Sequence, residues 1–420
     1  MSAKAIVYVV LDGVGDRRVS EYGNKTPLEM ALTPNLDRLT SKGVMGNVYT
    51  VKRGIAPESD AGVFSLLSYD PSRLDLSRGV VEALGSGLAF KDGELALRCN
   101  FATVQDDELV DRRAGRNVTD GEARELAEAI NAAPELRELC EFEFKATIGH
   151  RCALVLRRKG GLSDAVTNLD PAYARRGKVT VAKSGVKLPT PIPKCKPLKK
   201  NRIAAQTAEL LNEFSRRTYE VLRIHRVNVE REARGDFPAN FLLMRDAGTR
   251  LPKVRTLHEK FALRSIALAD MPVELGIAKV VGMDTAVFPP LRTSDAYLER
   301  ARKAVELTES YDLVYVHLKG PDEPGHDGDF EGKRKAIESI DLGFFAELAV
   351  ESCLICVTAD HSTPCVDRSH SDDPVPLLIS GPGVSSDGSL RFTEANAAKG
   401  RIGTLRHGYE ILPMLVKISG

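Results

Sequence analysis

The segment AIVYVVLDG, residues 5–13, decides the fold of the chain. It opens with seven apolar residues, most of them β-branched or aromatic, and ends at Asp12 and Gly13. A strand that is apolar at every position suits the interior of a parallel sheet, where helices cover both faces. The C-terminal third repeats this alternation, with further strands predicted at 312–318, 354–359 and 375–380. The alternation predicts an α/β fold with a mostly parallel sheet sandwiched by helices.

Helix signals lie between these strands. The sequence TPNLDRLTSKG (33–43) has the N-cap threonine, the proline at the first helical position and the glycine stop of a helix. A short strand is predicted at 46–51. The sequence APESDAG (56–62) then leads into the apolar stretch VFSLLSY, which places Ser59 at or near a helix N-terminus. Another helix is predicted at 331–349.

The middle of the chain has a different pattern of predicted strands and helices. Here short strands and helices mix, with strands predicted at 98–104, 152–157 and 179–182 and helices at 120–131 and 203–222. A chain of 420 residues is too long for one ordinary core. We therefore expect residues 1–74 and 268–420 to form one domain, and residues 75–267 to form an inserted α/β domain.

One stretch of the middle region is strongly basic. Residues 171–208 include ten Lys or Arg residues and no acidic residue. One interpretation is a solvated basic loop. The other is that the stretch contributes positive potential near an anionic substrate. The sequence leaves both interpretations open.

The composition argues against several functional classes. A net charge of +1 gives no reason to expect nucleic acid or a membrane surface as a partner. The apolar run at 5–11 is too short to span a bilayer, and no small-residue cleavage site follows it. Cys353 and Cys356 lie inside the apolar run CLICVTAD, so we interpret them as core positions rather than as a redox or zinc pair. We expect a protein of the reducing cytoplasm.

Acidic, imidazole and hydroxyl side chains collect where the predicted strands end. They are Asp12, Ser59, Asp322, His326, Asp360, His361 and His370. Mixed imidazole and carboxylate ligation suits zinc, manganese or a similar divalent ion. Seven ligands are too many for one tetrahedral site, but they divide over two metals, which clamp a phosphoryl group from both sides. At a helix N-terminus, the dipole and a bound metal would both favour the alkoxide of Ser59.

Each of these residues also has a simpler interpretation. Asp12 alone could be a turn or cap residue, and the Asp322–His326 pair could belong to an ordinary loop. Asp360 and His361 are more informative, because two adjacent ionisable groups close the apolar run LICVTA. The set taken together, in this order and context, indicates a metal site.

These residues resemble a known family. The segments PESDAG (57–62), TPNLDRL (33–39) and ADHSTPC (359–365), with the later HSDDPVP (370–376), resemble the alkaline phosphatase superfamily. Within it, the chain resembles most closely the archaeal-type cofactor-independent phosphoglycerate mutases. The resemblance covers nearly the whole chain, including NFATV (100–104) and, further along, DRRAGR, TAELLNEF and NFLLMRDAG.

The resemblance implies an activity and a ligand set. It implies that 3-phosphoglycerate and 2-phosphoglycerate, which are intermediates of glycolysis and gluconeogenesis, are interconverted without bisphosphoglycerate. Two divalent ions (Mn, Co, Zn or Mg) would be the cofactors, and Ser59 would be the nucleophile that becomes a phosphoserine. One metal would be held by Asp12, Ser59, Asp360 and His361. The other would be held by Asp322, His326 and His370.

The resemblance further implies that residues 75–267 form a substrate-holding cap (phosphotransferase) domain, whereas 1–74 and 268–420 bind the metals. Arginine suits planar, bidentate grips on carboxylate and phosphate. The candidates for this role are Arg113, Arg116, His150, Arg151, Arg245 and Lys279. The alternative for any single arginine is a surface charge.

Two rival functions share much of this pattern. A metal-dependent phosphatase, or a relative that acts on carbon–phosphorus bonds, would use the same ligands, so only the cap could discriminate. A non-catalytic binding protein could retain the fold, but every ligand position and the nucleophile are present here. We expect a small-molecule phosphoglycerate as the partner, with no nucleic acid or membrane. The sequence does not specify an oligomeric state.

Overall fold

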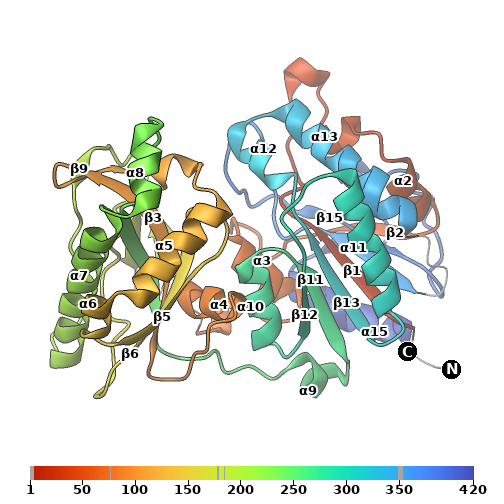
Figure 1. The fold of residues 1–420 in the computed structure, drawn as a ribbon. Coiled ribbons are helices and arrows are strands. Elements are labelled where there is room, and N and C mark those ends of the chain that lie inside the picture. Colours follow the sequence, from red (N-terminus) through yellow and green to blue (C-terminus); the bar gives the residue numbers. More distant parts are fainter. Residues whose placement is uncertain (1–3, 76, 177–178, 184, 349–352) are drawn as a thin grey trace. The chain divides into compact units, whose positions relative to one another are not determined.

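The computed structural model describes residues 4–75, 77–176, 179–183, 185–348 and 353–420. The chain divides into two compact units (Figure 1). Unit 1 comprises Met1–Leu74, Val254–Asp270 and Ile277–Gly420, and unit 2 comprises Asp75–Lys253 and Met271–Gly276. The sequence assigned residues 254–267 to the inserted domain. They belong to unit 1 instead, because they lead into a strand of its sheet, β11 (Ser265–Ala269).

Unit 1 is built on an eight-stranded sheet. Its strands follow the spatial order β12 (Asp284–Val287), β11, β13 (Leu313–Leu318), β1 (Ile6–Leu11), β14 (Leu354–Thr358), β15 (Val375–Ser380), β2 (Val44–Val48) and β16 (Gly403–Leu405). The first five strands run parallel, and β16 is parallel to β2. Only β15 pairs antiparallel, with β14 on one side and β2 on the other. The predicted mostly parallel α/β sheet is therefore confirmed.

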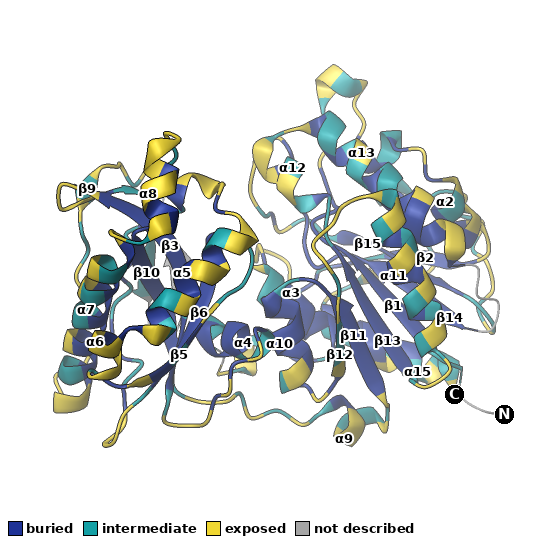
Figure 2. Cartoon of the chain, in the orientation of Figure 1, coloured by how far each residue is buried: buried dark blue, intermediate teal, exposed yellow. Residues whose placement is uncertain are grey.

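Both faces of this sheet are covered. Every residue of β1 is at most 1% exposed, and β13 is buried along its whole length (Figure 2). The covering helices include α2 (Pro34–Ser41), α11 (Ser294–Leu307), α13 (Phe330–Ile340) and α15 (Ile411–Ser419). The first three pack around a π-helical turn, η4 (Asp341–Phe345), while α15 packs on β14. The predicted helix at 331–349 thus divides into α13 and η4, and residue 349 lies outside the described residues.

The direction of β15 determines at which edge of the sheet His370 lies. Its pairing sets Val357 opposite Leu378 and Ile355 opposite Ser380. The start of β15 therefore lies at the same edge of the sheet as the end of β14. As a result His370, which precedes β15, reaches the edge where the parallel strands end, and that edge is where ligands bind in open α/β sheets.

Ser59 is the first residue of α3 (Ser59–Leu66), as the sequence predicts. A glycine lets this helix approach the sheet closely. A Cβ on Gly62 would lie only 2.5 Å from the carbonyl oxygen of Asp360. Any other residue at position 62 would therefore push the first turn of α3 away from the loop that carries Asp360 and His361.

Unit 2 is an antiparallel sheet with helices on both faces. Its strands are β5 (Glu141–Ala146), β6 (Arg151–Arg157), β3 (Leu95–Gln105), β4 (Glu108–Asp111) and β9 (Thr190–Pro191) in that order, with β10 (Phe241–Gly248) also paired to β3. Odd-numbered residues of β3, such as Leu97 and Phe101, join the core under α5 (Asp120–Ala132) and α7 (Arg202–Leu222). Ala96 faces the other way, toward α4 (Arg78–Gly85). This period of two is typical of strands covered on both faces.

Within the described ranges, no helix combines the length and the apolarity needed to cross a bilayer.

Candidate active site

One cluster of potential metal ligands lies at the ends of the central strands. Asp12 follows β1, His317 lies near the end of β13, and Asp360 follows β14. Each is at most 3% exposed. One ligand atom from each of these residues lies within 4.8 Å of the other two, a spacing that suits coordination of a shared ion.

A second cluster adjoins the first through His361. Asp322, His361 and His370 also offer ligand atoms within 4.8 Å of one another. The Nε2 atom of His361 lies 3.4 Å from Asp12 Oδ1 and 3.3 Å from Asp360 Oδ2. Its ring stacks on that of His370, with 3.7 Å between ring centroids. His361 therefore borders both clusters.

The remaining predicted ligands complete the arrangement. His326 Nε2 lies 3.5 Å from Asp322 Oδ1, because the two residues are one turn apart on α12 (Asp322–Asp327). Ser59 Oγ lies 3.3 Å from His361 Nε2. The structure thus brings all seven predicted ligand and nucleophile residues to one edge of the unit 1 sheet.

Hydrogen bonds fix the tautomers of three of the histidines. His370 Nδ1 lies 2.8 Å from the carbonyl oxygen of Pro57, and His326 Nδ1 lies 3.1 Å from that of Arg368. A carbonyl oxygen can only accept, so both Nδ1 atoms carry the proton. His361 Nδ1 lies 3.0 Å from the hydroxyl of Thr363, whose own proton goes to a carboxylate. All three rings therefore present an unprotonated Nε2, as metal-binding histidines with an outer hydrogen-bond partner do.

The donor set fits divalent metal ions. Asp12 Oδ1 and Asp360 Oδ2 are buried, and neither has a hydrogen-bond partner among the described residues. Buried carboxylate oxygens are costly unless they are paired or coordinate a metal. Carboxylates together with imidazole nitrogens are suitable ligands for zinc, manganese and similar ions. A cation at the first cluster would satisfy these two oxygens.

The shifted pKa values of the three carboxylates also favour a bound cation. Burial and the neighbouring charge of Asp12 raise the pKa of Asp360 to about 8. Burial also acts to raise the pKa of Asp12, but the charge of Lys319 and the neighbouring imidazoles of His317 and His361 hold that pKa well below its ordinary value. For Asp322 the histidines outweigh burial, and its pKa falls to about 2. Without a cation, therefore, Asp12 is ionised at neutral pH while its neighbour Asp360 tends to keep its proton.

Two residues of this edge were missed by the sequence analysis. His317 belongs to the first cluster, and the Nζ atom of Lys319 lies 2.9 Å from Asp12 Oδ2. Both stand in VYVHLKG, inside or just after a predicted strand. A polar residue within an otherwise apolar run is the available signal. His317, however, stands inside the predicted strand and not after it, and Lys319 is neither an acid, a histidine nor a hydroxyl residue.

In unit 2, predicted substrate-binding residues gather around His150. This imidazole is 9% exposed and lies just before β6. Burial and four positive charges lower the pKa of His150 to about 3, so it is neutral at physiological pH. The charges belong to Arg151, Arg113, Arg245 and Arg116. Four guanidinium groups around a neutral ring create a strong attraction for an anion.

A strained turn carries two of these arginines. Ala114, Gly115 and Arg116 all have positive φ angles, of 46°, 73° and 60°. The carboxylate of Asp111 holds the turn by accepting from the backbone N–H groups of Arg113 (2.7 Å) and Gly115 (3.0 Å). Non-glycine residues in this conformation are strained, and such strain concentrates at functional sites.

A buried carboxylate forms ion pairs with one arginine of this group and with the neighbouring Arg112. Asp170 is fully buried and accepts two hydrogen bonds from Arg112, at 2.6 and 2.7 Å. It also accepts one from Arg245 at 2.9 Å, and the guanidinium of Arg245 lies over the ring of Tyr173. Neither Arg112 nor Asp170 was singled out from the sequence. An isolated aspartate in NLDPAY gives no signal of a shared ion pair.

The last predicted substrate ligand, Lys279, lies in the other unit. It is exposed on α10 (Pro272–Val280) and is part of unit 1, whereas the other five candidates lie in unit 2.

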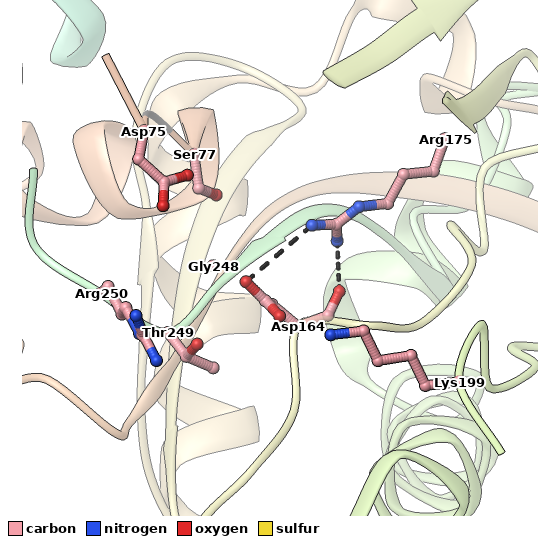
Figure 3. A pocket seen from close by; sticks show the side chains of 8 residues that line it. All are labelled: Asp75, Ser77, Asp164, Arg175, Lys199, Gly248, Thr249 and Arg250. Atoms are coloured by element: carbon pink, nitrogen blue, oxygen red, sulfur yellow. Dashed lines mark hydrogen bonds and ion pairs between the residues drawn. The ribbon is translucent and has the colours of Figure 1, made fainter. Parts of the chain in front are cut away.

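The basic stretch at 171–208 contributes to a cavity of unit 2 that is separate from the residues around His150. Arg175 and Lys199 help to line a cavity of about 240 Å³ (Figure 3). The guanidinium of Arg175 donates to the backbone carbonyl oxygens of Asp164 and of Ala247, which lies just before Gly248. The other lining residues are Asp75, Ser77, Asp164, Gly248, Thr249 and Arg250. The residues around His150 are not among the described residues that line this cavity, and residues 177, 178 and 184 lie outside the described part of the stretch.

Comparisons with known proteins give a consistent result. A family model described as 2,3-bisphosphoglycerate-independent phosphoglycerate mutase matches residues 40–228. A protein of that name from Aeropyrum pernix is 45% identical over 98% of this chain and 99% of its own. Another from Pyrococcus abyssi is 38% identical over 100% and 98%. Among solved structures, the PH0037 protein from Pyrococcus horikoshii is similar with a TM-score of 0.78 at 30% identity, over 100% of this chain and 98% of that one. The cofactor-independent phosphoglycerate mutase from Thermoplasma acidophilum has a TM-score of 0.65 at 34% identity, over 99% and 100%.

Proposed function

Because the chain belongs to the family of 2,3-bisphosphoglycerate-independent phosphoglycerate mutases, we propose that Ser59 is its nucleophile at a two-metal site. The enzyme interconverts 3-phosphoglycerate and 2-phosphoglycerate. The observation that carries the proposal is the position of Ser59 Oγ, at the N-terminus of α3 and 3.3 Å from His361 Nε2, the imidazole that borders both ligand clusters.

The ligands divide into two sets. We assign Asp12, Asp360 and His361, with Ser59 and the additional His317, to one ion. Asp322, His326 and His370 are assigned to the other. Bound divalent ions supply positive charge that neutralises phosphoryl oxygens and favours the ionised serine. The proposed ions are divalent: Mn, Co, Zn or Mg.

The chemistry at Ser59 is a double phosphoryl transfer. The serine oxygen bonds to phosphorus while the bond from phosphorus to the glycerate oxygen breaks, which yields a phosphoserine and glycerate. The serine hydroxyl loses its proton, and the released glycerate oxygen gains one. The other hydroxyl of the same glycerate then loses its proton and bonds to phosphorus while the bond from phosphorus to Ser59 Oγ breaks. The serine oxygen regains a proton in this second transfer. The N-terminal dipole of α3 favours the anionic form of the serine oxygen.

Unit 2 supplies the grip on glycerate in this proposal. Arg113, Arg116, Arg151 and Arg245 provide donors for carboxylate and phosphate oxygens, and His150 provides a neutral imidazole beside them. Holding the acceptor in place gives the second hydroxyl a large advantage over water. In this proposal, the binding of glycerate by unit 2 is therefore what makes the enzyme a mutase and not a phosphatase.

We also place the enzyme in the reducing cytoplasm. None of the seven cysteines, all of which lie among the described residues, forms a disulfide. Both Cys353 and Cys356 are buried, which supports this location and the core interpretation of the pair. Its partner is the small-molecule phosphoglycerate.

The proposed function predicts mutase turnover with little phosphate release. Metal-replete enzyme given 3-phosphoglycerate, with no bisphosphoglycerate, should form 2-phosphoglycerate, because the glycerate is held until the phosphoryl group returns. The measurement follows 2-phosphoglycerate by an enolase-coupled assay and inorganic phosphate in the same tube. Release of phosphate as fast as substrate disappears, without 2-phosphoglycerate, would instead indicate a phosphatase.

Loss of one gripping arginine should shift that balance. In Arg116→Gln, which removes an exposed charge, mutase turnover should fall by about tenfold or more, the usual cost of a charged hydrogen bond. The fraction of turnovers that end in free phosphate should rise, because glycerate escapes from the phosphoenzyme. Arg250→Gln is the matched control, since Arg250 is an exposed arginine of the same unit outside the His150 group. Equal effects of both substitutions would contradict the assignment.

A further inference from the structure

We propose that Lys333 is the positioning residue that holds two metal-ligand loops together. The inference rests on the proposed two-metal site. The two loops are residues 13–16, which follow Asp12 and are called the Asp12 loop here, and residues 362–365, which follow His361 and are called the His361 loop.

The environment of Lys333 is unusual for a lysine. Its side chain, on α13, is fully buried. The ammonium group donates to the carbonyl oxygen of Gly15 (2.9 Å), to Asp16 Oδ2 (2.8 Å) and to the carbonyl oxygen of Thr363 (2.8 Å). An ammonium group has three protons, and all three are used.

Two of these acceptors belong to one loop and the third to the other. The loops also contact each other directly: the N–H of Thr363 donates to the carbonyl oxygen of Gly15 at 3.0 Å. The carboxylate of Asp16 accepts from the N–H of Cys365 at 3.2 Å. A Cβ on Gly15 would lie 2.0 Å from Ser362 Oγ, so the loops are pressed together as closely as a glycine permits.

Thr363 links this arrangement to the metal ligands themselves. Its hydroxyl donates to Asp322 Oδ1 at 2.6 Å and lies 3.0 Å from His361 Nδ1. The carbonyl of the same residue is held by Lys333. The lysine therefore fixes the residue that orients one carboxylate and one imidazole of the site, and its other two bonds hold the loop that begins at Asp12.

A purely structural role would not require this lysine. Replacing a buried ion pair by apolar side chains of similar size is often neutral for stability or favourable. An apolar residue at position 333 would, however, leave the two loops without their shared donor. Outer hydrogen-bond partners of ligands are worth about 10–100-fold in metal affinity. Thr363 is such a partner of Asp322 and His361, so a loss of that size is expected if the absence of Lys333 releases Thr363.

The experiment compares Mn²⁺ binding to the full-length chain, with free Mn²⁺ counted by electron paramagnetic resonance. Lys333→Met should bind at least one of the two ions about 10–100-fold more weakly than wild type. Raising Mn²⁺ should restore part of its lost turnover. Arg300→Met is the matched control, because Arg300 is also buried in unit 1 and bonds one carboxylate, Asp270, and two backbone carbonyls. The control should be less stable to heat but should bind Mn²⁺ like wild type.

A second variant covers the case in which Lys333→Met does not fold. Asp16→Asn combined with Lys333→Met removes both charges, so no unpaired charge is left in the core. It should fold and still show weakened Mn²⁺ binding. The inference is overturned if the double variant binds Mn²⁺ as tightly as wild type, or if Arg300→Met weakens binding equally. Absence of Mn²⁺ binding by wild type would instead refute the proposed two-metal function.

Discussion

Replacing Ser59 with alanine is expected to lower mutase turnover by at least about a thousandfold, the scale of losing a catalytic nucleophile. The alanine lacks the oxygen that receives the phosphoryl group in the proposed mechanism. The fold should be unchanged, because Ser59 is half-buried and does not cap the helix. Metal binding should largely persist, since the carboxylate and imidazole ligands remain.

Ser65→Ala is the control for this prediction. Ser65 belongs to the same helix, is fully buried, and its hydroxyl has no hydrogen-bond partner among the described residues. Its loss should leave turnover close to that of wild type. Wild-type enzyme trapped during turnover should carry phosphate on Ser59, which mass spectrometry can locate. Phosphate on another residue, or a Ser59→Ala rate above about a thousandth of the wild-type rate, would refute the covalent mechanism.

The ligand edge could be predicted from the sequence because parallel strands align their ends. The continuous apolar runs that end at Asp12 and Asp360 identify two buried strands, and parallel neighbours bring their last residues together. The direction of β15 could not be predicted in this way. An apolar run has the same pattern in either direction, so the antiparallel pairing that places His370 at this edge appears only in the structure.

The supporting residues were beyond sequence reasoning for a different physical reason. The roles of Lys319 and Lys333 depend on acceptors that lie far away in the chain, such as Asp12 for the first and Thr363 for the second. Lysine is usually a surface residue, and nothing local distinguishes a buried one. In unit 2 the arginines could be proposed from their residue type, but their shared counter-ion, Asp170, depends on tertiary contacts.

Removal of the metal ions is expected to abolish activity. The serine would lose the positive charge that favours its ionised form, and the phosphoryl oxygens would lose their neutralising partners. Chelated enzyme should therefore have no measurable mutase turnover, and Mn, Co, Zn or Mg should restore it to differing degrees. Metal analysis must accompany the assay. Full turnover from enzyme shown to be free of metal would refute the two-metal assignment.

The metal-free enzyme should also reveal the site through the pH dependence of its stability. The pKa of Asp360, raised to about 8 in the metal-free fold, lies above its value in the unfolded chain, about 3.9. Between these values the folded state binds more protons than the unfolded state, so this residue lowers stability as pH rises from about 4 to 8.

A metal ion needs the ionised carboxylate and displaces that proton, so its apparent affinity should increase over the same range. Melting temperatures of metal-free and Mn²⁺-loaded enzyme, compared between about pH 6 and pH 8 at fixed Mn²⁺, should therefore diverge as pH rises. A gap that stays constant or narrows toward pH 8 would show that no buried carboxylate exchanges its proton for the ion.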